Sequence, residues 1–394
     1  MDILKRGEKY FFDVYKRFPI DVDKGRGVYL YDKGGRCYLD FLSGIAVNAL
    51  GYNHTAVTKA IEKQLKRNLH LSNYFLQDVQ VDLAEKLLGL TPFSKIFFTN
   101  SGTEAVEGIL KVLKKWGSQN KKNEIIAFEG SFHGRSLGAL SITIQEKYQK
   151  GFLPLLPDIK IVPFNDVEAF ENTINKNTLA VFYEGITGEG GIRPVSQEMF
   201  DAIKRGREKY GFKAVADEIQ TGIGRTGTLY YFEQCSVIPD AAASAKGLGG
   251  GLPLGAFMVS EELGDIFARG EHGTTYGGNP LACAAGLAVV NIVSDPQFLT
   301  NVQKQGQYLK SMLFELSEEF AAFCVEIRGE GLMAGLEVKQ DAFRIMDEAF
   351  QQGLIFNVAG GTTLRFIPPL IVDYSEIDEA GEKLRLSFKQ IFNK

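Results

Sequence analysis

The sequence is poor in the residues that bind metals or form disulfides. Its 394 residues include only four histidines and four cysteines, and the cysteines stand far apart, with no CxxC spacing, as Cys37, Cys235, Cys283 and Cys324. This pattern argues against a disulfide framework and against a zinc site, so we expect free thiols in a reducing compartment and no metal centre. The length is sufficient for two or three domains and a large buried core.

An excess of one charge and a long apolar run are also missing. The 44 Lys and Arg residues nearly balance the 48 Asp and Glu residues, for a net charge of -4. The chain thus has neither a basic field for nucleic acid nor a polybasic face for a membrane. The longest mildly apolar stretch, 281–293, is too short to span a bilayer, and residues 1–10 lack the features of a signal or transit peptide. We therefore expect a cytoplasmic protein without nucleic-acid or membrane partners.

The most unusual segment of the chain surrounds Lys246. Small residues precede it (Ala241-Ala-Ala-Ser-Ala245), and Gly-Leu-Gly-Gly-Gly251 follows it. Alanine, serine and glycine leave room for a flat ligand against the backbone. A poorly solvated lysine should have a lowered pKa, and a neutral amine is what Schiff-base chemistry requires. A surface lysine before a flexible glycine loop is an equally good interpretation of this segment alone, so Lys246 needs partners elsewhere.

Short apolar segments alternate with helical patterns along most of the chain. We expect strands at 95–99, 124–128, 159–163, 179–184, 213–217, 241–245 and 256–259. This alternation predicts an α/β fold with a doubly wound, mostly parallel sheet, which binds ligands at the carboxyl ends of its strands. Apolar periodicity also predicts helices over 56–69 and 80–88.

Both ends of the chain differ from this central pattern. Residues 27–42 alternate apolar and polar around Asp32-Lys-Gly-Gly35, which predicts a hairpin. After about residue 280, long helices precede short strands near 325–338 and 362–366. We expect the two ends to form a smaller α+β domain from residues 1–50 and 286–394, beside a large ligand-binding domain of residues 51–285.

The strand at 95–99 leads into Asn100-Ser-Gly-Thr-Glu104 and then an amphipathic helix. Ser101 and Glu104 have the spacing of a capping box, so the helix should start at Ser101. The free N–H groups and positive dipole end of such a helix suit a phosphate. An ordinary well-capped helix is the alternative.

The strand at 213–217 ends in a carboxylate, Asp217. A carboxylate at the end of a buried strand needs a partner, and a pyridinium nitrogen, a helix cap or an internal salt bridge would each serve. Downstream, Gly222-Ile-Gly-Arg-Thr-Gly227 matches the G-x-G-x-x-G of dinucleotide sites. The match is weak, because Leu229-Tyr-Tyr-Phe232 follows it rather than a convincing helix.

Around Lys246 and Asp217 the chain resembles the class III, ornithine aminotransferase-like, pyridoxal-phosphate transaminases, and most of all the N-acetylornithine aminotransferases of arginine biosynthesis. The resemblance runs from about Tyr15 to the C-terminus and includes seven ordered motifs: 100–105, 132–135, 188–191, 217–220, 243–251, 273–280 and 364–369. It implies the type I fold of these enzymes, pyridoxal 5'-phosphate as cofactor, and transamination between an N-acylated ornithine and 2-oxoglutarate.

The resemblance also implies roles for the residues that hold the cofactor. Lys246 would carry the cofactor as a Schiff base and shuttle a proton, and Asp217 would hold the pyridine nitrogen. The remaining contacts would come from Gln220 at the phenolic oxygen, Ile219 and Phe132 on the two faces of the ring, and the Gly102 and Thr103 amides at the phosphate. Thr275 resembles a threonine that binds the phosphate of the neighbouring subunit, which implies a homodimer with shared sites. From the residues alone, Phe132 and Ile219 could be core residues and Thr275 a turn residue.

Substrate-binding roles follow from the same resemblance. Arg365 resembles the arginine that binds the α-carboxylate of glutamate, and Glu189 resembles the group that pairs with this arginine when the other substrate is present. Arg135 would bind a second carboxylate, and Tyr15 would assist. Two arginines suit glutamate with its two carboxylates and an acylated ornithine with one, but outside the resemblance both would be ordinary surface or ion-pair arginines.

The chain departs from the family pattern in two places. The usual Glu-Pro-Ile/Val-Gln is here Glu184-Gly-Ile-Thr187, and the usual Gly-His-x-His-Pro is Gly51-Tyr-Asn-His-Thr55. Gly185 and Thr187 border the expected substrate channel, so the acyl group stays open. The alternatives are an ornithine, succinylornithine or 4-aminobutyrate aminotransferase, or a mutase on the same scaffold. More distant ones are a non-catalytic cofactor-binding module and a dinucleotide-dependent oxidoreductase.

Overall fold

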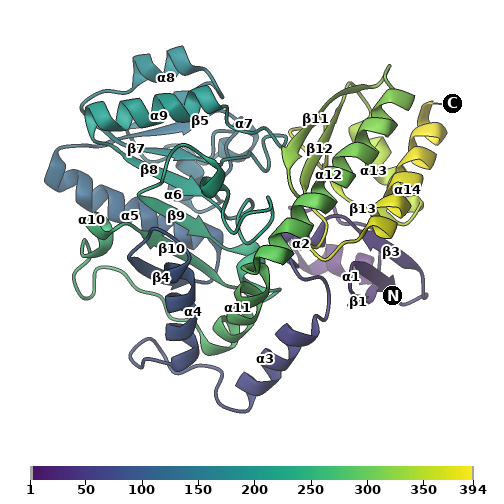
Figure 1. Cartoon of the computed structure of the whole chain (residues 1–394), viewed down its shortest axis with the longest axis horizontal. Coiled ribbons are helices and arrows are strands. Elements are labelled where there is room, and N and C mark those ends of the chain that lie inside the picture. Colours follow the sequence, from purple (N-terminus) through teal and green to yellow (C-terminus); the bar gives the residue numbers. More distant parts are fainter. Residues whose placement is uncertain (1–2, 393–394) are drawn as a thin grey trace.

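The computed structural model describes residues 3–392, and its centre is a seven-stranded sheet (Figure 1). The strand order is β4 (Lys95–Thr99), β10 (Gly255–Val259), β9 (Ala241–Ser244), β8 (Lys213–Asp217), β7 (Thr178–Tyr183), β5 (Glu124–Phe128) and β6 (Ile159–Val162). The strands from β9 to β6 pair in parallel, and β10 runs antiparallel to both of its neighbours. The predicted doubly wound, mostly parallel sheet is confirmed.

Helices cover both faces of this sheet because adjacent strand residues point in opposite directions. On β5, Ile125 belongs to the same apolar cluster as α5 (Gly102–Asn120), and the next residue, Ile126, belongs to the cluster of α9 (Gln197–Tyr210). Both residues are fully buried. The central strands β7, β8, β9 and β10 are buried along their whole length, and the edge strand β6 is partly exposed.

The other elements of this region are mostly helical. They are α3 (Thr55–Leu65), α4 (Asp78–Gly89), α6 (Leu137–Ser141), α7 (Glu146–Gln149), α8 (Val167–Thr173), α10 (Glu261–Gly264), α11 (Pro280–Val293) and the 3-10 helices η1 (Tyr231–Gln234) and η2 (Lys246–Gly249). The helix predicted over 56–69 ends at Leu65, so the prediction of a last helical turn over 66–69 is wrong. The side-chain amide of Gln64 donates to the carbonyl of Asn68, which stabilises a turn there instead of a helix.

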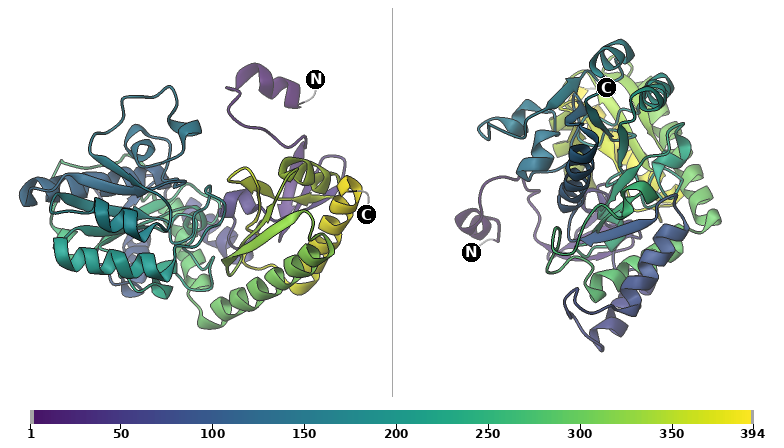
Figure 2. Two further views of the ribbon diagram at one scale, coloured as in Figure 1. Left: turned by 90° about the horizontal axis from the view of Figure 1, so that it is seen from above. Right: turned by 90° about the vertical axis from the view of Figure 1, so that its left-hand side faces the viewer.

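Two smaller sheets lie beside the central one (Figure 2). The first contains β1 (Val22–Arg26), β2 (Tyr29–Asp32), β3 (Cys37–Asp40) and β13 (Leu354–Ile355); the second contains β11 (Cys324–Glu330), β12 (Met333–Val338), β15 (Thr363–Phe366) and β14 (Asn357–Ala359). The predicted hairpin is confirmed as β2 paired with β3. Because β13 pairs with β3, the two ends of the chain share one sheet.

Three helices accompany these sheets: α12 (Pro296–Glu319), α13 (Ala342–Gln351) and α14 (Tyr374–Phe392). α14 packs against both α12 and α13. The domain boundaries at residues 50 and 285 stay a prediction. Between the regions, a short turn, α2 (Ser43–Ala46), follows β3.

The N-terminal helix α1 (Ile3–Tyr10) buries none of its residues and projects away from the rest of the chain in both views of Figure 2. Within residues 3–392, no single helix is long and apolar enough to cross a membrane. The pair α11 and α12 meets that length and composition only when taken together, across a bend of 74°.

Candidate active site

A cavity of about 490 Å³ opens at the carboxyl ends of β8 and β9. Nine of the predicted site residues line it: Gly102, Thr103, Phe132, Arg135, Glu189, Asp217, Ile219, Gln220 and Lys246. They come from segments more than 100 residues apart in the sequence, and the sheet unites them because its parallel strands all end at this edge.

Lys246 begins η2, and only Ala245 separates it from the four buried small residues of β9. Its φ of 44° lies in the left-handed region, which is strained for a residue with a side chain. Burial lowers the pKa of the Lys246 ammonium, against the raising effect of the Glu189 charge. The structure thus provides the poorly solvated amine that the sequence predicted, at the wall of the cavity.

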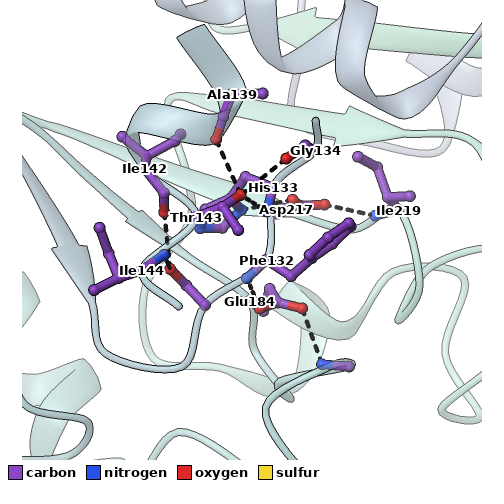
Figure 3. A network of polar contacts seen from close by, with 12 residues as sticks. Phe132, His133, Gly134, Ala139, Ile142, Thr143, Ile144, Glu184, Asp217 and Ile219 are labelled. Atoms are coloured by element: carbon purple, nitrogen blue, oxygen red, sulfur yellow. Dashed lines mark hydrogen bonds and ion pairs between the residues drawn. The ribbon is translucent and has the colours of Figure 1, made fainter. Parts of the chain in front are cut away.

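Asp217 is paired with a histidine that the sequence analysis did not assign. The imidazole Nδ1 of His133 lies 2.7 Å from Asp217 Oδ2, and both side chains are buried (Figure 3). Burial alone lowers the pKa of His133, but the hydrogen bond and the charge of Asp217 outweigh it and raise the pKa overall. The backbone N–H of Ile219 also donates to Asp217, at 3.0 Å. These two contacts fix the orientation of the carboxylate at the end of β8.

Glu184 is a second buried group without an assigned role. Its carboxylate accepts the backbone N–H of Phe132 at 3.0 Å and that of Gly188 at 2.9 Å (Figure 3). Burial raises the pKa of Glu184 to about 7, an effect that the nearby His133 opposes. Glu184 therefore joins the loop that carries Phe132 to the loop that carries Glu189.

The start of α5 forms the corner predicted for a phosphate. Ser101 is the N-cap, as predicted, and accepts the N–H of Glu104. The Glu104 carboxylate binds the N–H of Asn100 at 2.9 Å. The amides of the first turn, Gly102 and Thr103, have no acceptors within the helix because no helical carbonyl precedes them. A Cβ at Gly102 would lie only 2.6 Å from Ile219 Cδ1, so a glycine is needed for Ile219 to lie over this corner.

Arg365, on β15 of the second small sheet, contacts two residues that line the cavity. It is fully buried, and its Nη1 donates to Glu189 Oε1 at 2.7 Å and to Gln220 Oε1 at 3.2 Å. Its Nε donates to Asn357 at 2.9 Å, while its Nη2 has no partner among the described residues. Burial by itself raises the pKa of Glu189, but the charge and the hydrogen bond of Arg365 outweigh it, so the pKa is lowered. The two residues form a charged pair beside Lys246.

Comparison with known proteins agrees with this geometry. The family model for the class-III aminotransferases matches residues 11–388. The chain is 45% identical to an acetylornithine aminotransferase of Caldanaerobacter subterraneus over 95% of each chain, and 40% identical to one of Methanocaldococcus jannaschii over 98% of this chain and 97% of that one. The chain belongs to the class-III aminotransferases.

Solved structures of related proteins share the fold. Ornithine aminotransferase of Toxoplasma gondii has a TM-score of 0.95 at 27% identity, over 99% of this chain and 95% of that one. N-acetylornithine aminotransferase of Stenotrophomonas maltophilia has a TM-score of 0.85 at 31% identity, over 99% of each chain. The predicted type I fold and the predicted aminotransferase family are thus confirmed.

In this aminotransferase, three predicted site residues do not line the cavity. Arg365 reaches it only through its hydrogen bonds, as described above. Tyr15 is 71% exposed on the N-terminal segment, and Thr275 is exposed on a separate cavity of about 760 Å³. Arg135 does line the site, with its guanidinium 4.1 Å from the centre of the Tyr148 ring. Its exposed charge is therefore held in place by an aromatic face.

The G-x-G-x-x-G segment connects the central region to the second small sheet. Arg225, its central residue, is buried and donates to the carbonyls of Leu332 and Pro368, while its own carbonyl accepts the N–H of Leu332 at 3.0 Å. The short 3-10 helix η1 follows, rather than the long helix of a dinucleotide fold. The glycines thus belong to a segment that connects two regions of the chain, in agreement with the weak match of this segment to a dinucleotide-binding motif.

The departures from the family pattern also have local reasons. A Cβ at Gly185 would lie 2.1 Å from the Tyr231 ring, so the ring occupies the space that a larger residue would need. The Thr187 hydroxyl accepts the N–H of Arg193 at 3.0 Å, which closes the loop from 185 to 195. Tyr52, in place of the usual histidine, donates to the buried Asp40 at 2.5 Å.

Proposed function

We propose that this aminotransferase transfers the terminal amino group of N-acetylornithine to 2-oxoglutarate, giving N-acetylglutamate semialdehyde and glutamate in arginine biosynthesis. The observation that carries the proposal is the buried pair of Glu189 and Arg365 beside Lys246. Such a pair lets one pocket accept either a substrate with a second carboxylate or a substrate with a neutral chain. The names of the relatives that are 40–45% identical to this chain support the same substrate.

The proposed cofactor is pyridoxal 5'-phosphate, which, when bound, supplies an electron sink for the pair of electrons left at the substrate carbon that carries the reacting amino group. The cavity suits it: Asp217, backed by His133, would face the pyridine nitrogen, and the amides of Gly102 and Thr103 would face the phosphate. Phe132 and Ile219 would cover the two faces of the ring. Gln220 would reach the phenolic oxygen. Lys246 would bind the cofactor covalently through its side-chain amine.

Lys246 has a second role in this proposal, as the base at the reacting carbon. Its lowered pKa increases the fraction of neutral amine at physiological pH, and a neutral Nζ can accept a proton from the substrate. The charge of Arg365 acts in the same direction as burial on this pKa, and the charge of Glu189 opposes it. The protonation of Lys246 is therefore coupled to which carboxylate faces Arg365.

The two arginines divide the substrates between them. Arg135 would bind the side-chain carboxylate of glutamate or the single carboxylate of the acylated ornithine. Arg365 would bind a carboxylate only when glutamate is the substrate, namely its α-carboxylate. With an acylated ornithine, Arg365 faces a neutral chain, and an unpaired buried guanidinium is costly. Glu189 neutralises it in that half-reaction and turns aside for glutamate. We call residues 185–195 the gate loop.

We also propose a homodimer in the cytoplasm. The segment before α4 is strongly exposed and apolar: Tyr74 is 96% and Leu76 90% accessible. Both residues line the same cavity as Thr275. Apolar surface of this kind is typical of a protein interface. A second subunit that covers it would bring Thr275 towards the neighbouring site, and Tyr15, on the exposed N-terminal segment, would then assist in substrate binding.

Ornithine is the second candidate donor, because structures named ornithine aminotransferase share this fold so closely. A single-turnover screen distinguishes the candidates: the enzyme-bound cofactor is mixed with N-acetylornithine, N-succinylornithine, ornithine, 4-aminobutyrate or glutamate, and its visible absorbance is followed. We expect rapid bleaching by glutamate and N-acetylornithine and slow bleaching by the other three. Faster bleaching by ornithine than by N-acetylornithine would overturn the proposed substrate.

A further inference from the structure

Arg328, on β11, is a charged side chain of the second small sheet that contacts the gate loop. Its side chain is 9% exposed, and its Nε and Nη2 both donate to the backbone carbonyl of Gly191, at 3.2 and 2.9 Å. Nη2 also donates to the hydroxyl of Thr363 at 3.0 Å, and Nη1 pairs with Glu326 at 2.8 Å and with Glu337. A planar fork with five donors is required to make all these contacts at once.

The sheet register puts Arg328 in one row with Arg365. Arg328 pairs with Gly335 on β12, Gly335 pairs with Arg365 on β15, and Arg365 pairs with Asn357 on β14. Residues paired across a sheet point to the same face. The row therefore presents two arginines to the gate loop, one on each side of a glycine.

The gate loop packs onto this row through its backbone. A Cβ at Gly335 would lie 2.9 Å from the Cβ of Ile192, so the loop descends between the two arginines where the sheet has no side chain. Gly191 has a φ of 100° and would place a Cβ 3.1 Å from the Thr363 hydroxyl. The carbonyl of Glu189 accepts the N–H of Gly360 at 3.0 Å. The small sheet and the turn after β14 thus hold the backbone that follows the Glu189 side chain, and Glu184 holds the N–H of Gly188 before it.

We propose that Arg328 is a positioning residue for substrate selection: it fixes the gate-loop backbone so that only the Glu189 side chain changes position between the two substrates. This inference rests on the proposed function. With the backbone held, Glu189 returns to one defined place, 2.7 Å from Arg365, whenever the substrate chain is neutral. Without Arg328, Glu189 reaches Arg365 less often. The half-reaction that needs the pair is then weakened, and the glutamate half-reaction is not.

Arg328→Lys is the main test, because lysine keeps the charge beside Glu326 and Glu337 but has no planar fork to bind Gly191 and Thr363 together. The loss of one charge-assisted hydrogen bond should lower the rate of bleaching by N-acetylornithine per unit concentration about tenfold. The corresponding value for glutamate should stay within about twofold of the wild type. Amide hydrogen exchange in residues 185–195 should become faster in the same variant.

Two matched variants serve as controls. Glu326→Gln removes an ion pair of Arg328 and leaves the contact with Gly191, and Lys310→Ala removes a cation that binds Gly329 and Glu330 without touching the gate loop. Both should behave as the wild type in the two half-reactions and in exchange. Equal losses for the two donors in Arg328→Lys, or unchanged exchange in its gate loop, would overturn the proposal.

The hydrogen-exchange measurement also distinguishes a failure of the proposed function from a failure of the proposed role of Arg328. If the wild type reacts with no acylated ornithine, the proposed function fails, and faster gate-loop exchange in Arg328→Lys would still support the backbone contact. If the wild type reacts with N-acetylornithine and Arg328→Lys retains the wild-type ratio of the two donors, the proposed function stands and the role of Arg328 is refuted.

Discussion

Glu189→Gln tests the proposed substrate exchange most sharply, because glutamine keeps the shape and the oxygen acceptor and removes only the charge. Arg365 is fully buried, and its remaining partners, Gln220 and Asn357, are both neutral amides. The substitution therefore leaves a buried guanidinium without a counter-ion whenever the substrate does not bring a carboxylate. Truncating one member of a buried charged pair costs about 2–5 kcal/mol.

The lower end of that range applies here, because 23% of the Glu189 side chain is exposed to solvent. A loss of about 2 kcal/mol corresponds to about a 30-fold decrease in the specificity constant for N-acetylornithine. Glutamate should react as fast as with the wild type or faster, because its carboxylate no longer competes with Glu189 for Arg365. Stopped-flow rates for each donor, measured separately over a range of concentrations, give the two constants.

The pH dependence supplies an internal check. The pKa of Glu189 is lowered from its ordinary value of 4.5, so the pair is fully charged above that value and is lost only as the pH falls through the lowered pKa. Titration of Glu189 should therefore leave the ratio of the specificity constants for N-acetylornithine and glutamate unchanged between pH 6 and 8. Equal decreases for both donors in Glu189→Gln would refute the role of this residue in substrate selection.

Three further predictions concern the cofactor side of the site. His133→Gln should weaken cofactor binding and destabilise the apoenzyme. The pKa of His133 is raised in the folded state, so its pairing with Asp217 stabilises the protein fully below about pH 6.5 and is lost as the pH rises through the folded value. The difference in melting temperature from wild type should therefore shrink at alkaline pH, and a difference independent of pH would contradict the charged pair. Gly102→Ala should lower cofactor affinity at least tenfold, as measured by fluorescence titration, because the added methyl displaces Ile219; wild-type affinity would remove Ile219 from the site. Mixed dimers of one Lys246→Ala chain and one Thr275→Ala chain should contain one intact site, and so keep about half of the wild-type activity with wild-type cofactor affinity. If the active site of these mixed dimers instead binds the cofactor as weakly as the Thr275→Ala homodimer does, each site is built within one chain.

The strands and the residues at their carboxyl ends could be predicted from the sequence, because buried parallel strands are short apolar runs and because ligands bind where they end. Lys246, Asp217 and Gly102 all stand at such ends and were placed correctly in one cavity. His133 and Glu184 were missed, although Glu184 ends the strand predicted at 179–184. Their partners are 84 and 52 residues away along the chain, so no local pattern shows what each side chain would pair with.

Backbone geometry and cross-sheet contacts were also beyond the sequence. Residues 43–46 all have positive φ values, and only Gly44 is of a type that adopts them readily; the β-branched Ile45, at 63°, gives no signal of such a turn. The row of Arg328, Gly335 and Arg365 depends on the register of three strands. That register is set by packing and not by any short motif.

The central claim is that the chemistry occurs at Lys246, with Asp217 and His133 behind the cofactor. Borohydride reduction of the purified enzyme, followed by digestion and mass spectrometry of the peptides, locates the lysine that carries the cofactor. We predict that the peptide containing Lys246 gains the mass of the reduced cofactor and that the visible absorbance is lost in parallel. Modification of a different lysine, or of none in an enzyme that still transfers amino groups, would contradict the account.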